Sequence, residues 1–441
     1  MDYDSIDTTI TTLGEAKISS PVSHEKSRVY GRRFVSDTDR VLIDTDPDRL
    51  IAKVREGKEI HSFELAGPRR EIYFDPVKLR CGLVTCGGLC PGLNDIIRAI
   101  VLELYHCYGV RNIYGFRYGL QGFVPEYGHD YMELKPASVT SIHEMGGSIL
   151  GTSRGRQPAE EIIGCLERMN IGILFMIGGD GTLRAASAIA DVVSEKNLKI
   201  SVVSVPKTID NDIQTVSRSF GFHTAVDVAT GAIRGAHNEA QGHPNGIGLI
   251  KLMGRNSGFI AATATLAMQD VNFALIPEAD FDLEAPNGLL GALERRLEER
   301  GHAVIVVAEG AGQKFFKGRE KKSDESGNPR LEDIGLFLKD EITSYFKAGK
   351  TDITIKYIDP SYMIRSLSAN ASDNVFCNYL GRDAVHAGMA GKTRLLISRW
   401  NEQFVHVPMS AAVGKCKQID PNGKLWFSVL ESTGQGPLKN R

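Results

Sequence analysis

The stretch ILFMIGGDGTLRAASAIADVV, residues 173–193, joins a run of apolar residues to an alanine-rich segment through a glycine-rich turn. The apolar run 173–177 predicts a buried strand, and residues 183–193 predict a helix. A strand that passes directly into a helix is the repeating unit of a mainly parallel α/β sheet. This stretch therefore predicts an α/β fold in which the turn 178–182 lies at the carboxyl end of a strand.

The same alternation of short apolar runs and amphipathic stretches continues from residue 79 onward. Further strands are predicted at residues 80–85, 200–205, 247–252, 273–276 and 303–308, and further helices at residues 96–104 and 331–346. Because single hydrophobic cores stop growing near about 250–300 residues, we expect a chain of 441 residues to form two lobes. Residues 1–78 are polar and are predicted to form an N-terminal extension.

Composition excludes several classes of protein. The 52 lysines and arginines nearly balance the 54 aspartates and glutamates, so no general positive charge attracts nucleic acid or an anionic membrane. No stretch approaches the ~18 consecutive apolar residues of a membrane span. The first residues are acidic and lack the apolar core of a signal peptide, so we expect a cytoplasmic protein with reduced cysteines.

Glycine-rich turns follow two of the predicted strands, at residues 87–94 (GGLCPGLN) and 178–182 (GGDGT). Ligands of open parallel sheets bind beyond the carboxyl ends of strands, and a helix start offers free N–H groups to a phosphate. Asp180 would repel a phosphate unless Mg²⁺ lay between them, which makes Asp180 a candidate metal ligand. The alternative is that Asp180 caps its helix.

The third strand leads into PKTIDND, residues 206–212. Asp210 and Asp212 share one face of an extended segment, where a carboxylate could take a proton from an attacking hydroxyl group. Lys207 offers a positive charge to a phosphate. A turn held by aspartate and asparagine side chains is the alternative interpretation.

More candidate binding residues follow the later strands or lie in glycine-containing loops. Lys356, Tyr362 and Arg365 combine two cations with a phenol and would suit a phosphate ester. The other candidates are Met253, Gly254 and Arg255, then Glu309, and Arg154 in the loop 151–155. The segment 388–393 (GMAGKT) is not a phosphate loop, because His386 stands where the first glycine is required.

The chain resembles the 6-phosphofructokinases over roughly residues 79–400. The resemblance rests on the order of five motifs, which are GGLCPGLN (87–94), GGDGT (178–182), PKTIDND (206–212), MGR (253–255) and AEG (308–310). GGDGT alone also occurs in NAD kinases and lipid kinases, whereas TIDND followed by MGR separates the phosphofructokinases from them.

The resemblance implies a two-lobed phosphofructokinase-like fold, with mainly parallel sheets flanked by helices. A phosphoryl-donor lobe would comprise residues 79–222 with about 366–441, and a fructose 6-phosphate lobe residues 223–365. It also implies a glycolytic, allosteric enzyme that forms a homodimer or homotetramer.

The resemblance also implies roles for individual residues. Asp210 would be the base for the sugar 1-hydroxyl, supported by Thr208 and Asp212. Arg255, also counted among the catalytic residues, would contact the phosphate side of the substrate, and Asp180 would bind Mg²⁺. Donor residues would be Gly88, Tyr118, Arg154, Gly179, Asp180, Gly181, Thr182 and Lys207. Sugar-phosphate residues would be Thr208, Ile209, Asp210, Met253, Gly254, Arg255, Glu309, Lys356, Tyr362 and Arg365.

The identity of the phosphoryl donor depends on two positions. Pyrophosphate-dependent relatives carry an acid at the position of Gly181 and a lysine at the position of Lys207. Glycine at 181 leaves room for the nucleotide, so we expect ATP, as in the plant and protist branch of the family. The first alternative is a reversible pyrophosphate-dependent enzyme.

The second alternative is a catalytically silent regulatory subunit, which should have lost Asp180, Asp210 or Asp212. The chain also departs from a common bacterial pattern. Gly246 replaces an arginine that reaches a neighbouring subunit's site, and Tyr362 and Lys356 replace a histidine and an arginine. These departures put the usual bacterial effector control in doubt.

Overall fold

The computed structural model describes residues 6–23, 34–284, 286–318, 330–414 and 416–440. Two compact units make up the chain. Unit 1 contains residues 1–208, 213–221 and 366–415, and unit 2 contains residues 209–212, 222–365 and 416–441. The C-terminal segment 416–441 belongs to unit 2, whereas the sequence placed it with the donor lobe. The described part of the N-terminal extension belongs to unit 1.

Unit 1 is built on a nine-stranded sheet of order β3-β4-β17-β16-β10-β9-β6-β7-β8. Its parallel centre comprises β7 (Asn112–Phe116), β6 (Arg80–Thr85), β9 (Ile173–Gly178), β10 (Ser201–Pro206) and β16 (Leu395–Trp400). All six residues of β9 are buried, as the apolar run required. The strands predicted at 80–85, 173–177 and 200–205 are therefore confirmed.

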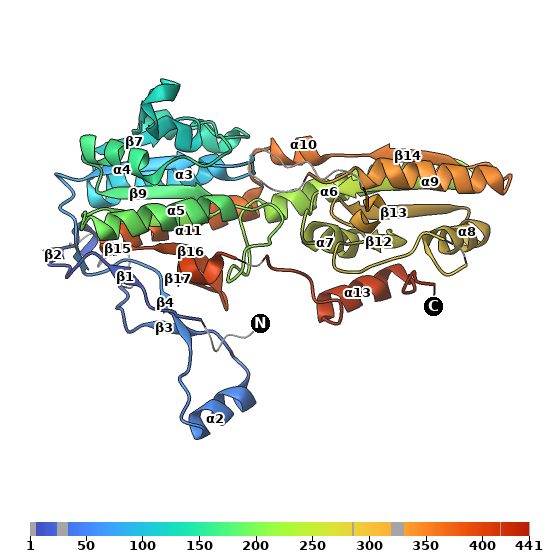
Figure 1. Cartoon of the computed structure of the whole chain (residues 1–441), viewed down its shortest axis with the longest axis horizontal. Coiled ribbons are helices and arrows are strands. Elements are labelled where there is room, and N and C mark those ends of the chain that lie inside the picture. The colour runs from blue at the N-terminus through green and yellow to red at the C-terminus, as the bar shows by residue number, and fades with distance from the viewer. Residues whose placement is uncertain (1–5, 24–33, 285, 319–329, 415, 441) are drawn as a thin grey trace. The chain divides into compact units, whose positions relative to one another are not determined.

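Helices pack against this sheet (Figure 1). Helix α5 (Asp180–Glu195) contacts β9 and β10, and α11 (Ala371–Met389) contacts β10 and α3 (Leu93–Leu102). Helix α4 (Ala159–Arg168) packs on α5. The helices predicted over 96–104 and 183–193 are confirmed, although α3 passes at Glu103 into a turn of π-helix.

Three antiparallel strands extend the sheet at one edge. They are β17 (Gln403–Pro408), β4 (Ser62–Leu65) and β3 (Arg40–Leu42), so part of the N-terminal extension is built into the main sheet. The other short elements of unit 1 are β1 (Thr11–Thr12), β2 (Ile18–Ser19), α2 (Pro47–Arg55), β5 (Glu71–Ile72), β8 (Met132–Glu133), β15 (Lys392–Thr393) and α12 (Met409–Ala412).

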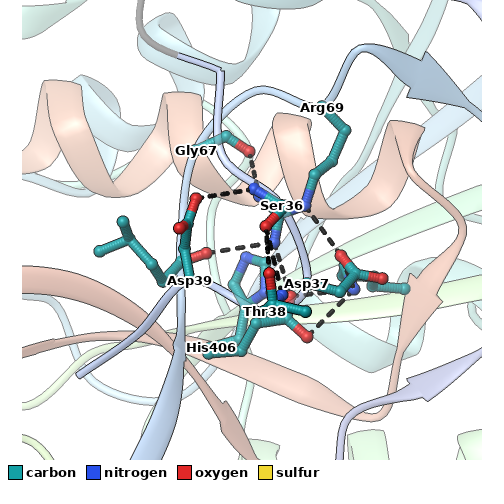
Figure 2. Close-up of polar contacts among 10 residues, drawn as sticks. Ser36, Asp37, Thr38, Asp39, Gly67, Arg69 and His406 are labelled. Atoms are coloured by element: carbon teal, nitrogen blue, oxygen red, sulfur yellow. Dashed lines mark hydrogen bonds and ion pairs between the residues drawn. The ribbon is translucent and has the colours of Figure 1, made fainter. Parts of the chain in front are cut away.

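A buried ionic network fixes the extension to the sheet. The carboxylate of Glu64 lies 2.6 Å from Arg69, 2.9 Å from Lys392 and 2.9 Å from His406, all with side chains less than a tenth exposed. Asp37 contacts Arg69 and Lys392, each at 3.0 Å (Figure 2). Buried charges are tolerated when they are paired, so Lys392 serves this network rather than a phosphate loop.

Unit 2 contains a four-stranded parallel sheet of order β12-β13-β11-β14. The strands are β11 (Gly246–Leu252), β12 (Phe273–Leu275), β13 (His302–Ala308) and β14 (Thr354–Ile358), and the first three confirm predicted strands. The helices are α6 (Phe222–Gln241), α7 (Phe259–Met268), α8 (Leu289–Arg300), α9 (Ile334–Ala348), α10 (Ser361–Arg365) and α13 (Lys424–Thr433). Among the described residues of both units, no helix combines the length and apolar character that crossing a membrane requires.

Candidate active site

The first glycine-rich turn, in unit 1, requires glycine at position 92 for its backbone conformation and for its close packing. Gly92 begins α3 with φ +100°, and a Cβ there would lie 2.7 Å from Cys377 Sγ. The ammonium of Lys207 donates a hydrogen bond of 2.6 Å to the carbonyl oxygen of Gly88. The structure thus brings together Gly88 and Lys207, two of the predicted donor residues.

The second glycine-rich turn starts α5. Gly179 is the N-cap residue and Asp180 is the first helical residue, so the interpretation of Asp180 as a helix cap is wrong. The Asp180 carboxylate is 41% exposed and pairs with Arg184 one turn later at 2.7 Å. A Cβ on Gly181 would meet no described atom within 4 Å, so this side of the turn is open.

A loop carrying Arg154 is bonded to the first turn. The N–H of Gly87 donates to the carbonyl of Ser153 at 3.1 Å, and the Thr152 hydroxyl donates to the carbonyl of Gly87. Tyr118 lies against the start of the same loop, since a Cβ on Gly151 would lie 2.8 Å from its ring. The Arg154 side chain is exposed. Unit 1 therefore places Tyr118 and the loop of Arg154 next to the first glycine-rich turn.

Carboxylates gather around Asp210 in unit 2. Burial and the negative charges of Asp212 and Glu309 raise the pKa of Asp210 well above its ordinary value, while a backbone hydrogen bond from Arg255 and the charge of Arg255 oppose this increase. The carbonyl of Asp210 accepts a hydrogen bond of 3.2 Å from the Ser257 hydroxyl. The predicted catalytic residues Asp210, Asp212 and Arg255 therefore lie together with the predicted sugar residue Glu309.

The turns that carry Arg255 and Glu309 interlock. The N–H of Glu309 donates to Leu252 at 2.9 Å, and the N–H of Gly310 donates to Gly254 at 3.1 Å. Gly254 has φ +130°, and a Cβ on Gly310 would collide with the carbonyl of Arg255. Burial raises the pKa of Glu309, whereas the charges of Arg255, Lys251 and Arg365 lower it.

The remaining residues predicted to bind the sugar or its phosphate lie in different surroundings. Tyr362 is 78% exposed, and the Arg365 guanidinium lies 4.8 Å from the centre of its ring. The Lys356 ammonium lies 3.2 Å from Glu239. Met253 and Ile209 are buried. Thr208 belongs to unit 1, where its carbonyl accepts a hydrogen bond from Ser219.

Two lysines near this group were not predicted from the sequence. The Lys251 ammonium lies 2.7 Å from Asp333 and 2.9 Å from Asp359, and Asp359 in turn accepts the N–H of Ser361 at the start of α10. In the sequence, Lys251 could be noticed only as the single cation within the apolar run 247–252. Lys417, whose N–H donates to the carbonyl of Asp212 at 2.7 Å, carried no comparable signal.

Comparisons with known proteins agree with these motifs. The phosphofructokinase family model matches residues 80–388. The chain is 50% identical over 440 residues to the ATP-dependent 6-phosphofructokinase of Borreliella burgdorferi, covering 98% of this chain and 97% of the relative. It is 47% identical over 370 residues to the chloroplastic ATP-dependent 6-phosphofructokinase 5 of Arabidopsis thaliana, covering 84% of this chain and 68% of the relative.

A solved pyrophosphate-dependent phosphofructokinase from Nitrosospira multiformis has the same fold. The TM-score is 0.67 at 19% identity, and the match covers 81% of this chain and 92% of the other. The protein belongs to the phosphofructokinase family, which confirms the resemblance deduced from the motifs.

Proposed function

We propose that this protein transfers a phosphoryl group from ATP to the 1-hydroxyl of fructose 6-phosphate, yielding fructose 1,6-bisphosphate in glycolysis. The observation that carries this proposal is the group of Asp210, Asp212, Glu309 and Arg255 in unit 2. The names of the Borreliella and Arabidopsis relatives, both ATP-dependent 6-phosphofructokinases, support it.

The glycine-rich turns of unit 1 would bind the donor. Their helix starts offer backbone N–H groups to phosphate oxygens, and Lys207 and Arg154 supply positive charge. Gly88, Tyr118 and residues 179–182 complete this proposed set. Because phosphoryl transfer requires mainly positioning and charge stabilisation, such a set is suited to the donor half of the reaction.

Asp180 fits a magnesium ion that arrives with the donor. Mg²⁺ is commonly bound by one or two carboxylates together with substrate phosphates rather than by a cage of protein ligands. The described residues contain no cluster of three or more potential metal ligands, whereas the partly exposed Asp180 offers one carboxylate. When bound, the ion would neutralise charge on the phosphate oxygens.

Asp210 would remove the proton of the sugar 1-hydroxyl. A carboxylate with a raised pKa is a stronger base than an ordinary one, and general base catalysis contributes about 10²–10⁴-fold. Arg255 would stabilise the charge of the transferring group, and Thr208 and Asp212 would support the base. Ile209, Met253, Gly254 and Glu309 would contact the sugar, and Lys356, Tyr362 and Arg365 its 6-phosphate.

Gly181 would select ATP over pyrophosphate. Since a side chain at this position meets no described protein atom, it would occupy space that the glycine leaves for the nucleotide. Lys207 favours the alternative of a pyrophosphate donor, because a compact cation suits that anion. Because Asp180, Asp210 and Asp212 are all present, a catalytically silent subunit is not favoured.

A coupled assay with fructose 6-phosphate and Mg²⁺ would compare ATP with pyrophosphate for wild type and Gly181→Asp. We expect ATP-dependent activity in wild type and its collapse in the variant. An acid in the first turn of a helix is tolerated, so the variant should fold. Gly231→Asp, at another helical glycine with no described neighbour, is the matched control. Activity with pyrophosphate alone would overturn the proposed donor.

The cellular context is part of the same proposal. We place the enzyme in the cytoplasm as a homodimer or homotetramer, without nucleic-acid or membrane partners. Light scattering after size-exclusion chromatography would measure the oligomeric state directly, and a monomeric mass in the active fraction would refute that part.

A further inference from the structure

Unit 2 contains a lysine that the proposed mechanism does not use. The backbone N–H of Lys417 donates a hydrogen bond of 2.7 Å to the carbonyl of Asp212. Its ammonium lies 5.0 Å from the centre of the Phe259 ring, at the start of α7. The face of an aromatic ring attracts a cation, so both the backbone and the side chain of Lys417 have defined contacts.

The two residues that follow Lys417 attach its segment to unit 2. The N–H of Ile419 donates to the Glu278 carboxylate at 2.9 Å, and Glu278 also accepts the N–H of Gly258 at 3.0 Å. The side-chain amide of Gln418 donates to the carbonyl of Asn256 at 3.0 Å. Segments near a chain end stay ordered when they are tied down in this way, so residues 416–419 hold Lys417 against the turn that follows β11.

Electrostatics link Lys417 to the carboxylate group. Burial lowers the pKa of Lys417 to about 8, and the negative charge of Asp212 opposes that decrease. The charges acting on Asp210 are those of Asp212, Glu309 and Arg255. The positive charge of Arg255 thus acts on Asp210, and the negative charge of Asp212 acts on Lys417.

We infer that Lys417, whose backbone is hydrogen-bonded to Asp212, is a positioning residue for phosphoryl transfer and that its positive charge offsets one of the negative charges around Asp210. This inference rests on the proposed function. Without the ammonium, the charge of Asp212 acts undiminished on Asp210, and the base keeps its proton to a higher pH. Less enzyme then carries an ionised base at neutral pH.

The test is the pH dependence of kcat/KM for fructose 6-phosphate in Lys417→Met and Lys417→Arg. At an effective dielectric constant of about 20, a unit charge about 10 Å from a titrating group changes the pKa of that group by about 1. The acidic limb of the methionine variant should therefore move upward by about one pH unit. Its activity at neutral pH should fall about tenfold and recover as the pH rises.

The arginine variant should keep the acidic limb of wild type. Because a guanidinium does not lose its proton in proteins, this variant should also lack an alkaline limb near pH 8 that arises from Lys417. Lys424→Met, at an exposed lysine of the same C-terminal segment, is the matched control and should follow wild type. A methionine variant that melts like wild type and keeps the wild-type acidic limb would overturn the inference.

A second measurement does not depend on activity. In protein carrying ¹³C-labelled lysine side chains, the Lys417 resonance should titrate near pH 8 and should shift to lower pH in Asp212→Asn. An unchanged midpoint in that variant would refute the coupling. Absence of activity in wild type with either donor would refute the proposed function instead, and the titration would still decide whether Lys417 acts on Asp212.

Discussion

Replacing Asp210 with asparagine should abolish turnover and stabilise the fold at the same time. The amide keeps the size of the carboxylate but cannot accept the proton of the sugar hydroxyl. General base catalysis is worth about 10²–10⁴-fold, so kcat should fall by at least about 100-fold. We propose that binding of fructose 6-phosphate depends mainly on the other residues assigned to the sugar, so the Kd of fructose 6-phosphate should change by less than about threefold.

The stability gain follows from the raised pKa of Asp210. A carboxyl group with a raised pKa in the folded state stabilises the fold only at acidic pH, and that contribution is lost as the pH rises above its ordinary value of 3.8. A tenfold difference in proton affinity between the folded and unfolded states corresponds to about 1.4 kcal/mol of stability. Asp210 as a whole residue is half-buried although its Oδ1 atom is fully buried, so we expect a gain on the order of 1–3 kcal/mol at pH 7.5.

The assay combines a coupled kinetic measurement, calorimetric titration with fructose 6-phosphate and thermal unfolding at pH 5 and 7.5. The difference in melting temperature between variant and wild type should be larger at pH 7.5, since the unfolded chain loses the Asp210 proton above 3.8 whereas the folded chain retains it to a higher pH, and this cost grows between pH 5 and 7.5. Asp270→Asn, at a carboxylate of unit 2 for which no role is proposed, controls for general effects of removing an acid. A variant that melts below wild type at both pH values, or that keeps more than a tenth of its kcat, would refute the reasoning.

The remaining predictions concern the ionic contacts of both units. Glu64→Gln leaves the buried cations Arg69 and Lys392 undercompensated and should cost about 3–5 kcal/mol of unfolding free energy. The pKa of Glu64 is lowered to about 2, so the stability that Glu64 contributes is present above pH 4.5 and is lost as the pH falls toward 2. The free energy of unfolding of the variant, measured with denaturant, should therefore depend less on pH in that range than that of wild type. Lys251→Met removes the cation that joins Asp333 to Asp359 and should raise KM for fructose 6-phosphate about tenfold with kcat nearly unchanged. A tenfold fall in kcat would contradict a purely binding role for Lys251. Arg184→Gln frees the Asp180 carboxylate and should lower the half-saturating Mg²⁺ concentration about twofold in kinetic titrations, and an increase would count against Asp180 as the metal ligand.

The fold could be predicted where the apolar pattern was continuous. Strand β9 and residues 303–308 of β13 are runs of buried, mainly apolar residues in the interior of parallel sheets, and such runs are visible in the sequence alone. Strand β14 was missed because all five of its residues are only partly buried and it includes Lys356. The antiparallel edge strands were missed for a related reason, since β3 is mainly exposed and β4 contains Glu64, whose burial depends on partners distant in sequence.

In the candidate site too, some residues could be predicted from the sequence and others could not. Arg255 and Glu309 could be grouped because they follow the neighbouring parallel strands β11 and β13, whose carboxyl ends lie at one edge of the same sheet. Asp210 and Asp212 follow β10 of the other sheet, so only the family resemblance linked them to Arg255 and Glu309. Lys417 follows no strand of unit 2, so its place beside Asp212 depends on the path of the chain after unit 1. The pairing of Asp180 with Arg184 required knowledge of where α5 begins.

The order in which the chain contributes to unit 2 has a consequence for how the enzyme is made. The unit is assembled from residues 209–212, 222–365 and 416–441, and the last of these supplies Lys417 and also Gln435, whose side chain bonds both backbone groups of Ala274 in β12. Synthesis proceeds from the N-terminus, so unit 1 has all its residues at position 415, before unit 2 has the last segment it requires. A chain that has been synthesised only as far as residue 415 therefore lacks part of unit 2 until residues 416–441 have been added.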